Sequence, residues 1–248
     1  MKAQTAVVTQ ERSQLAIARW LALGLLTLLV SVNASAQAGG AELKEKLAAL
    51  KQSAAANQQR LHKYKWTEIQ QVTFKGETKP QQEFACQYGP DGQVQKIPLT
   101  QQQQPSGGKV KQRMIEKKKD EMEQYMGQVK SLLALYVPPN PQKMQQAMQA
   151  GKVSLSRDAG AGLDNLTFKD YAQSGDQMVV AFDPAAKKIA NLNVNTYMGE
   201  AKDAVTLIVD FATLPDGTNY AEKTVLNVAA KQIVVTTNNT NYHTLGGM

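Results

Sequence analysis

The feature that most constrains the fold is the grouping of short β-type segments into two blocks of the sequence. Within each block the turns between segments are too short for crossover connections. The first block contains the runs Tyr64 to Phe74, Gln82 to Tyr88 and Gln93 to Leu99, separated by Gly76-Glu77 and Asp91-Gly92. The second block contains seven runs, predicted near residues 152–156, 165–172, 177–182, 188–197, 203–213, 220–229 and 231–237. Short connections favour antiparallel neighbours. The sequence therefore predicts an α+β fold with a large curled antiparallel sheet, a half-open β-barrel of about ten strands covered by helices.

A helical segment over residues 110–150 separates the two blocks. Its first helix, Val110 to Val137, is predicted to end at Pro138-Pro139, because proline disfavours helical geometry in the preceding residue and has no N–H to donate. Asn140-Pro141 is typical of a new helix start, and Gly151 of its end. The concave side of a curled sheet is apolar and must be covered. We therefore expect these two helices to form a lid over the sheet.

The segment before the first block is predicted to be peripheral. Residues 37–63 comprise a flexible lead and an amphipathic helix over residues 41–61. The apolar stripe of this helix is narrow and consists of Leu43, Leu47, Leu50 and Ala54. We expect the helix to pack on the outside of the sheet, and we assign the half-barrel domain to residues 64–248.

Residues 1–36 have the composition of an export signal. Lys2, Arg12 and Arg19 form a positive n-region, and an apolar run of 13 residues follows from Trp20 to Val32. Ala34-Ser35-Ala36 is a small-x-small cleavage site. We predict cleavage between Ala36 and Gln37 and a periplasmic or secreted product that is soluble. The alternative is an uncleaved signal anchor, although this run is short for a membrane span. Lipid modification would require a cysteine after the cleavage point, where the chain has Gln37.

The charge balance argues against nucleic-acid binding. The formal charge of +7 falls to +5 when the signal is removed with its three bases and one acid. Part of the excess lies at the start of the predicted long helix, at Lys109, Lys111, Arg113, Lys117, Lys118 and Lys119. These residues either contact anionic headgroups at a membrane surface or form a solvated face interleaved with acidic residues. We expect no nucleic-acid partner and a monomeric protein.

No pattern of residues in the sequence is typical of catalysis or metal binding. His62 and His243 lie near opposite ends of the chain and match no nucleophile or metal motif. Four aspartates recur every six residues without the spacing of a calcium loop, and we interpret them as turn and strand-edge residues: Asp158, Asp164, Asp170 and Asp176. We expect neither an enzyme nor a cofactor.

The single cysteine is predicted to be buried. Cys86 shares one face of its strand with Phe84 and Tyr88, where a small apolar side chain fits. An intermolecular disulfide or a reactive thiol is the alternative.

Two hairpins and the order of elements carry a resemblance to a known family. The hairpins contain the turn Phe182-Asp183-Pro184-Ala185, followed by Lys188 to Tyr197, and the segment Leu214 to Tyr220. Together they resemble the outer-membrane lipoprotein carriers and their relatives, which include the outer-membrane lipoprotein receptor and a periplasmic sensor that restrains an anti-sigma factor. The resemblance implies an unclosed barrel, a helical lid and a hydrophobic cavity between them. The chain differs from that pattern in its long basic helix and its Gln-rich stretch, and no functional residue is transferred.

The predicted lid and the second block supply candidate ligand-binding residues. In the lid these are Met114, Ile115, Met122, Met126, Val129, Leu133, Met144 and Met148. On the cavity face of the sheet they are Val205, Leu207, Val209 and Phe211. Methionine adapts to variable apolar partners, which is typical of a lipid-binding lid, but it also fills ordinary cores.

Two functions are consistent with these patterns. The first is an exported protein that binds a lipid or acylated ligand in an apolar cavity, opened by movement of residues 110–150. The resemblance adds a lipoprotein carrier or sorting-like protein as one form of this function. The alternative is an envelope module for protein interaction or stress sensing, with a self-filled core. The loop at Gln101 to Gln104 and the helix over 41–61 would then offer contact surfaces.

Overall fold

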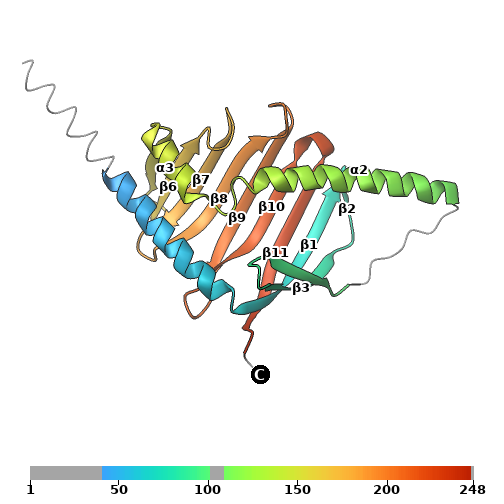
Figure 1. Cartoon of the computed structure of the whole chain (residues 1–248), viewed down its shortest axis with the longest axis horizontal. Coiled ribbons are helices and arrows are strands. Elements are labelled where there is room, and N and C mark those ends of the chain that lie inside the picture. The colour runs from blue at the N-terminus through green and yellow to red at the C-terminus, as the bar shows by residue number, and fades with distance from the viewer. Residues whose placement is uncertain (1–40, 101–108, 247–248) are drawn as a thin grey trace, which may run out of the picture. The chain divides into compact units, whose positions relative to one another are not determined.

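The computed structural model describes residues 41–100 and 109–246, except for the side chains of residues 109–116 and 119. The chain from Leu47 onward forms one compact unit, and the residues before it belong to a separate unit. A helix covers residues 41–61. It is followed by β1 (Tyr64–Phe74), β2 (Glu77–Thr78), β3 (Gln82–Tyr88), β4 (Val94–Pro98), α2 (Lys109–Leu133), α3 (Pro141–Gln149), β5 (Val153–Asp158), β6 (Leu163–Lys169), β7 (Gln177–Asp183), β8 (Lys188–Tyr197), β9 (Ala204–Thr213), β10 (Asn219–Val228), a 3₁₀ turn at Ala229–Lys231, and β11 (Ile233–Thr244) (Figure 1).

The strands form a single antiparallel sheet. Their order is β4-β3-β1-β11-β10-β9-β8-β7-β6-β5, and β2 pairs with β1. The two blocks of the sequence meet in the sheet through one strand pair. It joins β1, the first strand of the first block, to β11, the last strand of the second block. Within the described residues the path does not close, because β4 and β5 are its two ends. The predicted α+β fold with a large open antiparallel sheet is confirmed.

Strand positions follow the sequence pattern closely, with one clear exception. The predicted runs 64–74, 82–88 and 188–197 coincide with β1, β3 and β8. The last strand continues to Thr244, whereas its apolar run ends at residue 237. The polar second half of β11 pairs with the first half of β1. Backbone pairing with a long neighbour therefore extends this strand beyond its apolar residues.

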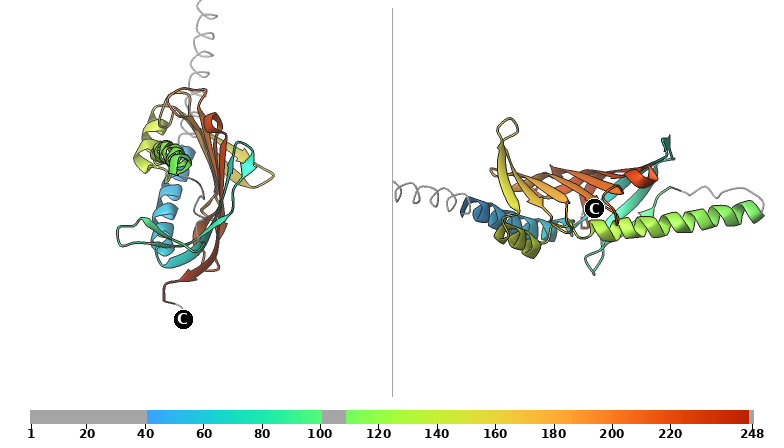
Figure 2. Two further views of the ribbon diagram at one scale, coloured as in Figure 1. Left: turned by 90° about the vertical axis from the view of Figure 1, so that its right-hand side faces the viewer. Right: turned by 90° about the horizontal axis from the view of Figure 1, so that it is seen from above.

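Helices α2 and α3 lie on the same face of the sheet, here called the inner face (Figure 2). α2 crosses β10, β11 and β1 (Figure 1). α3 begins as predicted, because the side chain of Asn140 accepts hydrogen bonds from the N–H groups of Gln142 and Lys143. It is followed by Gly151, whose φ of 68° is readily accessible to glycine.

α2 ends at Leu133, four residues before the predicted end at Val137. The last turn tightens, since Leu135 N donates to Leu132 O at 3.1 Å and Tyr136 N donates to Leu133 O at 2.9 Å. Helical geometry is thus lost before the two prolines are reached. The tightened turn directs the side chain of Tyr136 inward, where it is fully buried.

The helix over residues 41–61 does not pack on the outside of the sheet. Its residues from 47 onward lie on the side that α2 and α3 occupy (Figure 2). Ser53 donates a hydrogen bond to the Lys187 carbonyl, and Asn57 exchanges two hydrogen bonds with the backbone of Asn219. The predicted stripe also changes, because Ala54 is exposed. Leu50 is buried and Leu47 half-buried, so the helix keeps part of its apolar stripe, and polar contacts to two hairpin ends add to it.

Two predicted segments, the signal at 1–36 and the Gln-rich stretch 101–108, lie outside the described residues. In the part of the chain that the structure describes, every helix is too short or too polar to span a lipid bilayer.

Candidate ligand-binding face

The inner face beneath α2 is apolar. Successive side chains of a strand point to opposite faces of a sheet. Val72 and Phe74 of β1 point toward α2, and the strand register places Val235 and Ile233 of β11 opposite them. The helix–sheet cluster formed here consists of Val129, Val205, Val228, Ile233, Val72, Phe74, Met122, Tyr125, Met126, Leu132, Leu133, Met198, Leu226 and Val235.

The helix–sheet cluster is less completely buried than the rest of the inner face. Among the described residues, four of its members are buried, and the others, including Met122 and Met126, are half-buried. On β6, β7 and β8 six apolar inner side chains are at most 1% exposed, namely Leu166, Phe168, Met178, Val180, Leu192 and Val194. Less apolar area is removed from water per residue beneath α2, so that region costs less free energy to open.

A buried hydrogen-bond network fixes the C-terminal end of α2 to the well-packed half of the sheet. The hydroxyl of Tyr136 donates to Oδ2 of Asp176 at 2.5 Å and lies 2.8 Å from Oγ1 of Thr196 on β8. Asp176 also accepts hydrogen bonds from the backbone N–H groups of Tyr171, Ala172 and Gln173. A carboxylate with four donors is fully satisfied when buried. This end of α2 is therefore anchored, while the cluster beneath α2 stays half-buried.

The environment keeps the Tyr136 hydroxyl protonated. Burial raises its pKa, and the hydrogen bond to Asp176 raises the pKa further. The hydroxyl consequently remains a hydrogen-bond donor throughout the neutral pH range.

The structure brings together only part of the predicted ligand-binding set. Met122, Met126, Val129 and Leu133 of α2 meet Val205 of β9 in the helix–sheet cluster. Farther along β9, Leu207 and Val209 are buried and Phe211 is half-buried.

The remaining members of the predicted set lie elsewhere. Met144 is buried and Met148 half-buried on α3, which packs against β6 and not against the cluster. The side chains of Met114 and Ile115 lie outside the described residues. Of the basic residues near the start of α2, Lys117 and Lys118 are exposed. The structure does not describe the side chains of the other four, Lys109, Lys111, Arg113 and Lys119.

A polar band borders the cluster on the inner face. Toward its start, the inner side of β1 continues with Gln70 and Glu68, which pair in register with Thr237 and Asn239 of β11. Thr237 in turn pairs with Thr224 of β10. Gln70, Thr224, Thr237 and Asn239 are half-buried, whereas Glu68 is 6% exposed. A single sheet face thus passes from apolar residues beneath α2 to hydrogen-bonding groups beside them.

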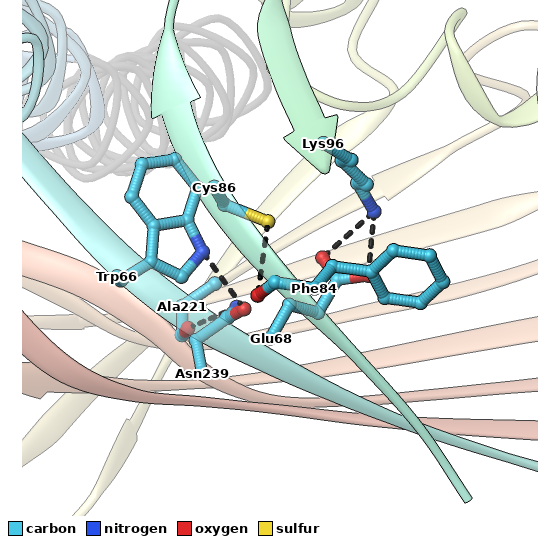
Figure 3. Close-up of polar contacts among 7 residues, drawn as sticks. All are labelled: Trp66, Glu68, Phe84, Cys86, Lys96, Ala221 and Asn239. Carbon is cyan, nitrogen blue, oxygen red and sulfur yellow. Dashed lines mark hydrogen bonds and ion pairs between the residues drawn. The ribbon is translucent and has the colours of Figure 1, made fainter. Parts of the chain in front are cut away.

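An ion pair crosses the sheet within this band. Nζ of Lys96 on β4 lies 2.6 and 2.7 Å from the two carboxylate oxygens of Glu68 (Figure 3). Nearby, Trp66 Nε1 donates to Oδ1 of Asn239 at 3.1 Å, and Asn239 Nδ2 donates to the Ala221 carbonyl at 2.9 Å. These contacts fix the side chains at the edge of the band.

Aromatic rings gather beyond the polar band, near the start of β1. Trp66 stacks on Tyr242 with ring centroids 5.4 Å apart, and His62 stacks on Tyr88 at 4.5 Å. Tyr64 and Tyr220 complete the aromatic cluster through contacts with Tyr242. The inner face over β1, β11 and β10 therefore has three zones in sequence: apolar, polar and aromatic.

Cys86 is a buried, free thiol, which confirms the main prediction for this residue. Burial raises the pKa of the thiol to about 11, and the charge of Glu68 contributes to the rise. Since the thiolate is the reactive form, the thiol is poorly nucleophilic at neutral pH.

Glu68 and Asp176 were not predicted to be buried. For Glu68 a signal was present, because it shares the alternation of Tyr64 and Trp66 and so falls on the buried face of β1. Asp176 was assigned only a turn role. Nothing local to Lys96 or Tyr136 indicates their partners, since β3 separates Lys96 from β1 and 40 residues separate Tyr136 from Asp176.

Comparison with known proteins gives likenesses of structure. No family model matches the chain, and no curated protein matches its sequence. A DUF1329 family protein from Desulfovibrio piger has a TM-score of 0.44 and 8% identity, over 83% of this chain and 94% of that one.

Two further solved structures are similar at the same level. A domain from Vibrio parahaemolyticus, described as an outer membrane lipoprotein-sorting protein domain, has a TM-score of 0.40 and 9% identity, over 83% of this chain and 94% of that one. A LolA superfamily protein from Nitrosomonas europaea has a TM-score of 0.34 and 8% identity, over 76% and 88%.

Proposed function

We propose that the protein binds a lipid or another acylated ligand between α2 and the inner face of the sheet. The observation that carries this proposal is the uneven packing of that face. Among the described residues, four members of the cluster beneath α2 are buried and the others are half-buried, while six apolar inner side chains of β6 to β8 are at most 1% exposed. An apolar chain that enters beneath α2 would complete the burial of residues such as Met122, Met126 and Leu226.

The anchor at Tyr136 supports a hinged opening of α2. Because Tyr136 is held by Asp176 and Thr196, the C-terminal end of α2 would stay in place while residues 117–133 move. Burial of an acyl chain supplies roughly 0.8 kcal/mol per methylene. A chain of about ten methylenes would then supply roughly 8 kcal/mol toward displacing the side chains of α2.

The proposed setting of this function is the cell envelope. Residues 1–36 have the features of a cleaved export signal. Mass spectrometry of the protein from a periplasmic fraction should show an N-terminus at Gln37. An intact N-terminus at Met1 would contradict removal of a signal peptide.

Paired substitutions beneath α2 test the ligand proposal. Replacing Met122 and Met126 together by glutamine should weaken binding of a fluorescent fatty acid at least about tenfold, because polar groups would be desolvated by the chain. The matched control is Ile208→Gln, since Ile208 lies on the opposite face of β9 and is already 37% exposed. Circular dichroism should show the same fold in both variants. Unchanged binding in the double variant would contradict the proposal.

A second function, protein interaction, is favoured by the apolar residues at the β4 edge. Ile97 is 64% exposed, Leu99 56% and Val94 39%. If this edge is the functional surface, Ile97→Lys should abolish recovery of a protein partner from delipidated envelope extract. The same variant should leave fatty-acid binding unchanged under the lipid-binding proposal.

A further inference from the structure

The polar band contains one buried charge beside the proposed acyl-chain site. Glu68 lies on the inner side of β1, four residues from Val72 of the helix–sheet cluster. Four residues of strand span roughly 13 Å. A ligand whose apolar chain lies beneath α2 would therefore bring its polar end within reach of the Glu68 carboxylate.

The partner of this carboxylate is attached at the edge of the sheet. Lys96 comes from β4, an end strand of the sheet, and its side chain is 43% exposed, whereas the side chain of Glu68 is only 8% exposed. A buried carboxylate without a cation is strongly destabilising. Lys96, with a flexible stem, can leave Glu68 only if another cation takes its place.

The neighbouring groups suit a charged and hydrogen-bonding ligand. Gln70, Thr224 and Thr237 are half-buried, and they place amide and hydroxyl groups between the ion pair and the apolar cluster. Trp66 lies beside Glu68 and donates its indole N–H to Asn239 (Figure 3). Its ring is stacked on Tyr242 and closes the aromatic side of the polar band.

We propose that the polar band is the headgroup site for an amphiphile that carries a primary ammonium and a phosphate, as in a phosphoethanolamine lipid. In the complex the ligand ammonium replaces Lys96 at Glu68, and the released Lys96 contacts the ligand phosphate. Both charges of the protein and both charges of the headgroup are then paired. This inference rests on the proposed function and names the class of ligand that binds there.

Lipids that share one acyl chain and differ in headgroup test this assignment. We would titrate monomeric lysophosphatidylethanolamine, lysophosphatidylglycerol and lysophosphatidylcholine, and the corresponding free fatty acid, and follow Trp66 fluorescence and native mass spectra. The ethanolamine lipid should bind about tenfold more tightly than the other two phospholipids. Phosphatidylglycerol lacks the cation, and the quaternary ammonium of choline has no N–H to donate to Glu68.

Variants separate a headgroup site from a purely structural ion pair. Glu68→Gln should abolish the preference for the ethanolamine lipid over the glycerol and choline lipids. The control is Glu77→Gln, which removes a similar but exposed ion pair with Lys79 on the surface and should leave the preference intact. Lys96→Gln leaves Glu68 without its cation, so the ethanolamine lipid should raise the Tm of this variant more than it raises that of the wild type. A structural clamp predicts no such rescue.

The outcomes are distinguishable from failure of the proposed function. Equal binding of all lipids by the wild type, a preference that survives Glu68→Gln, or absence of rescue in Lys96→Gln would overturn the headgroup site alone. Absence of binding for every lipid, fatty acid included, would overturn the proposed function with it. Soluble phosphoethanolamine that binds as tightly as the lipid would show that the free headgroup is the ligand and would overturn the assignment to an amphiphile.

Discussion

The hydroxyl of Tyr136 donates a 2.5 Å hydrogen bond to Asp176, and this contact joins the end of α2 to the loop between β6 and β7. Both residues are buried, at 0% and 3% exposure. The contact fixes the C-terminal end of α2, while the rest of the described helix lies on a cluster in which most side chains are half-buried.

Removal of this hydroxyl should loosen α2. Tyr136→Phe takes one of four donors from a buried carboxylate, so we expect a loss of about 1–2 kcal/mol in the free energy of unfolding. Urea unfolding measures the loss. The control is Tyr197→Phe, because the Tyr197 hydroxyl donates to the Ser174 carbonyl in an exposed contact at 2.7 Å. It should cost less than about 1 kcal/mol. Equal effects of the two variants would contradict the anchor.

Alkaline pH should destabilise the protein through its buried and half-buried tyrosines. Burial is the main cause of raised pKa values at Tyr64, Tyr88, Tyr125, Tyr136, Tyr171, Tyr220 and Tyr242. Above about pH 10 the unfolded chain loses these protons before the folded protein does. The contribution of these tyrosines to stability should therefore be constant below that pH and fall as the pH rises above it. Urea midpoints between pH 8 and 11 measure the slope, which should be shallower in Tyr136→Phe. An identical slope would contradict the assignment to Tyr136.

The thiol of Cys86 should be unreactive in the folded protein. Its pKa of about 11 and its 2% exposure leave little accessible thiolate at pH 8. A disulfide reagent such as Ellman's reagent should react completely in denaturant and on a far slower time scale without it. Rapid reaction of the native protein would show that this part of the sheet opens readily.

Two phenylalanines provide a direct comparison of packing in the two halves of the inner face. Phe168→Ala removes a side chain with 0% exposure and should cost about 3–5 kcal/mol. Phe74→Ala removes a half-buried side chain beneath α2 and should cost clearly less. Chemical denaturation of both variants measures the difference. Equal costs would contradict the view that the cluster is incompletely packed.

The strands were largely predictable from the sequence, because alternation and turn residues are local signals. Asn140 and Gly151 were also predictable, since each acts at a helix end next to it in the chain. The end of α2 was not, because the hydrogen bonds of Tyr136 to Asp176 and Thr196 join distant parts of the chain. The same limit applies to the candidate site. The register of β1 with β11 aligns Glu68 and Gln70 with Asn239 and Thr237, and no periodicity in either segment specifies that pairing.

Photo-crosslinking with a diazirine fatty acid tests the central claim most directly. The wild-type protein would be labelled with this probe, digested, and mapped by mass spectrometry. The account predicts labels on peptides that contain Met122 and Met126 of α2 and Leu226 of β10, with competition by unlabelled fatty acid. Labels confined to the exposed residues Ile97 of β4 and Leu99 just after it, or no competed label, would contradict ligand binding beneath α2.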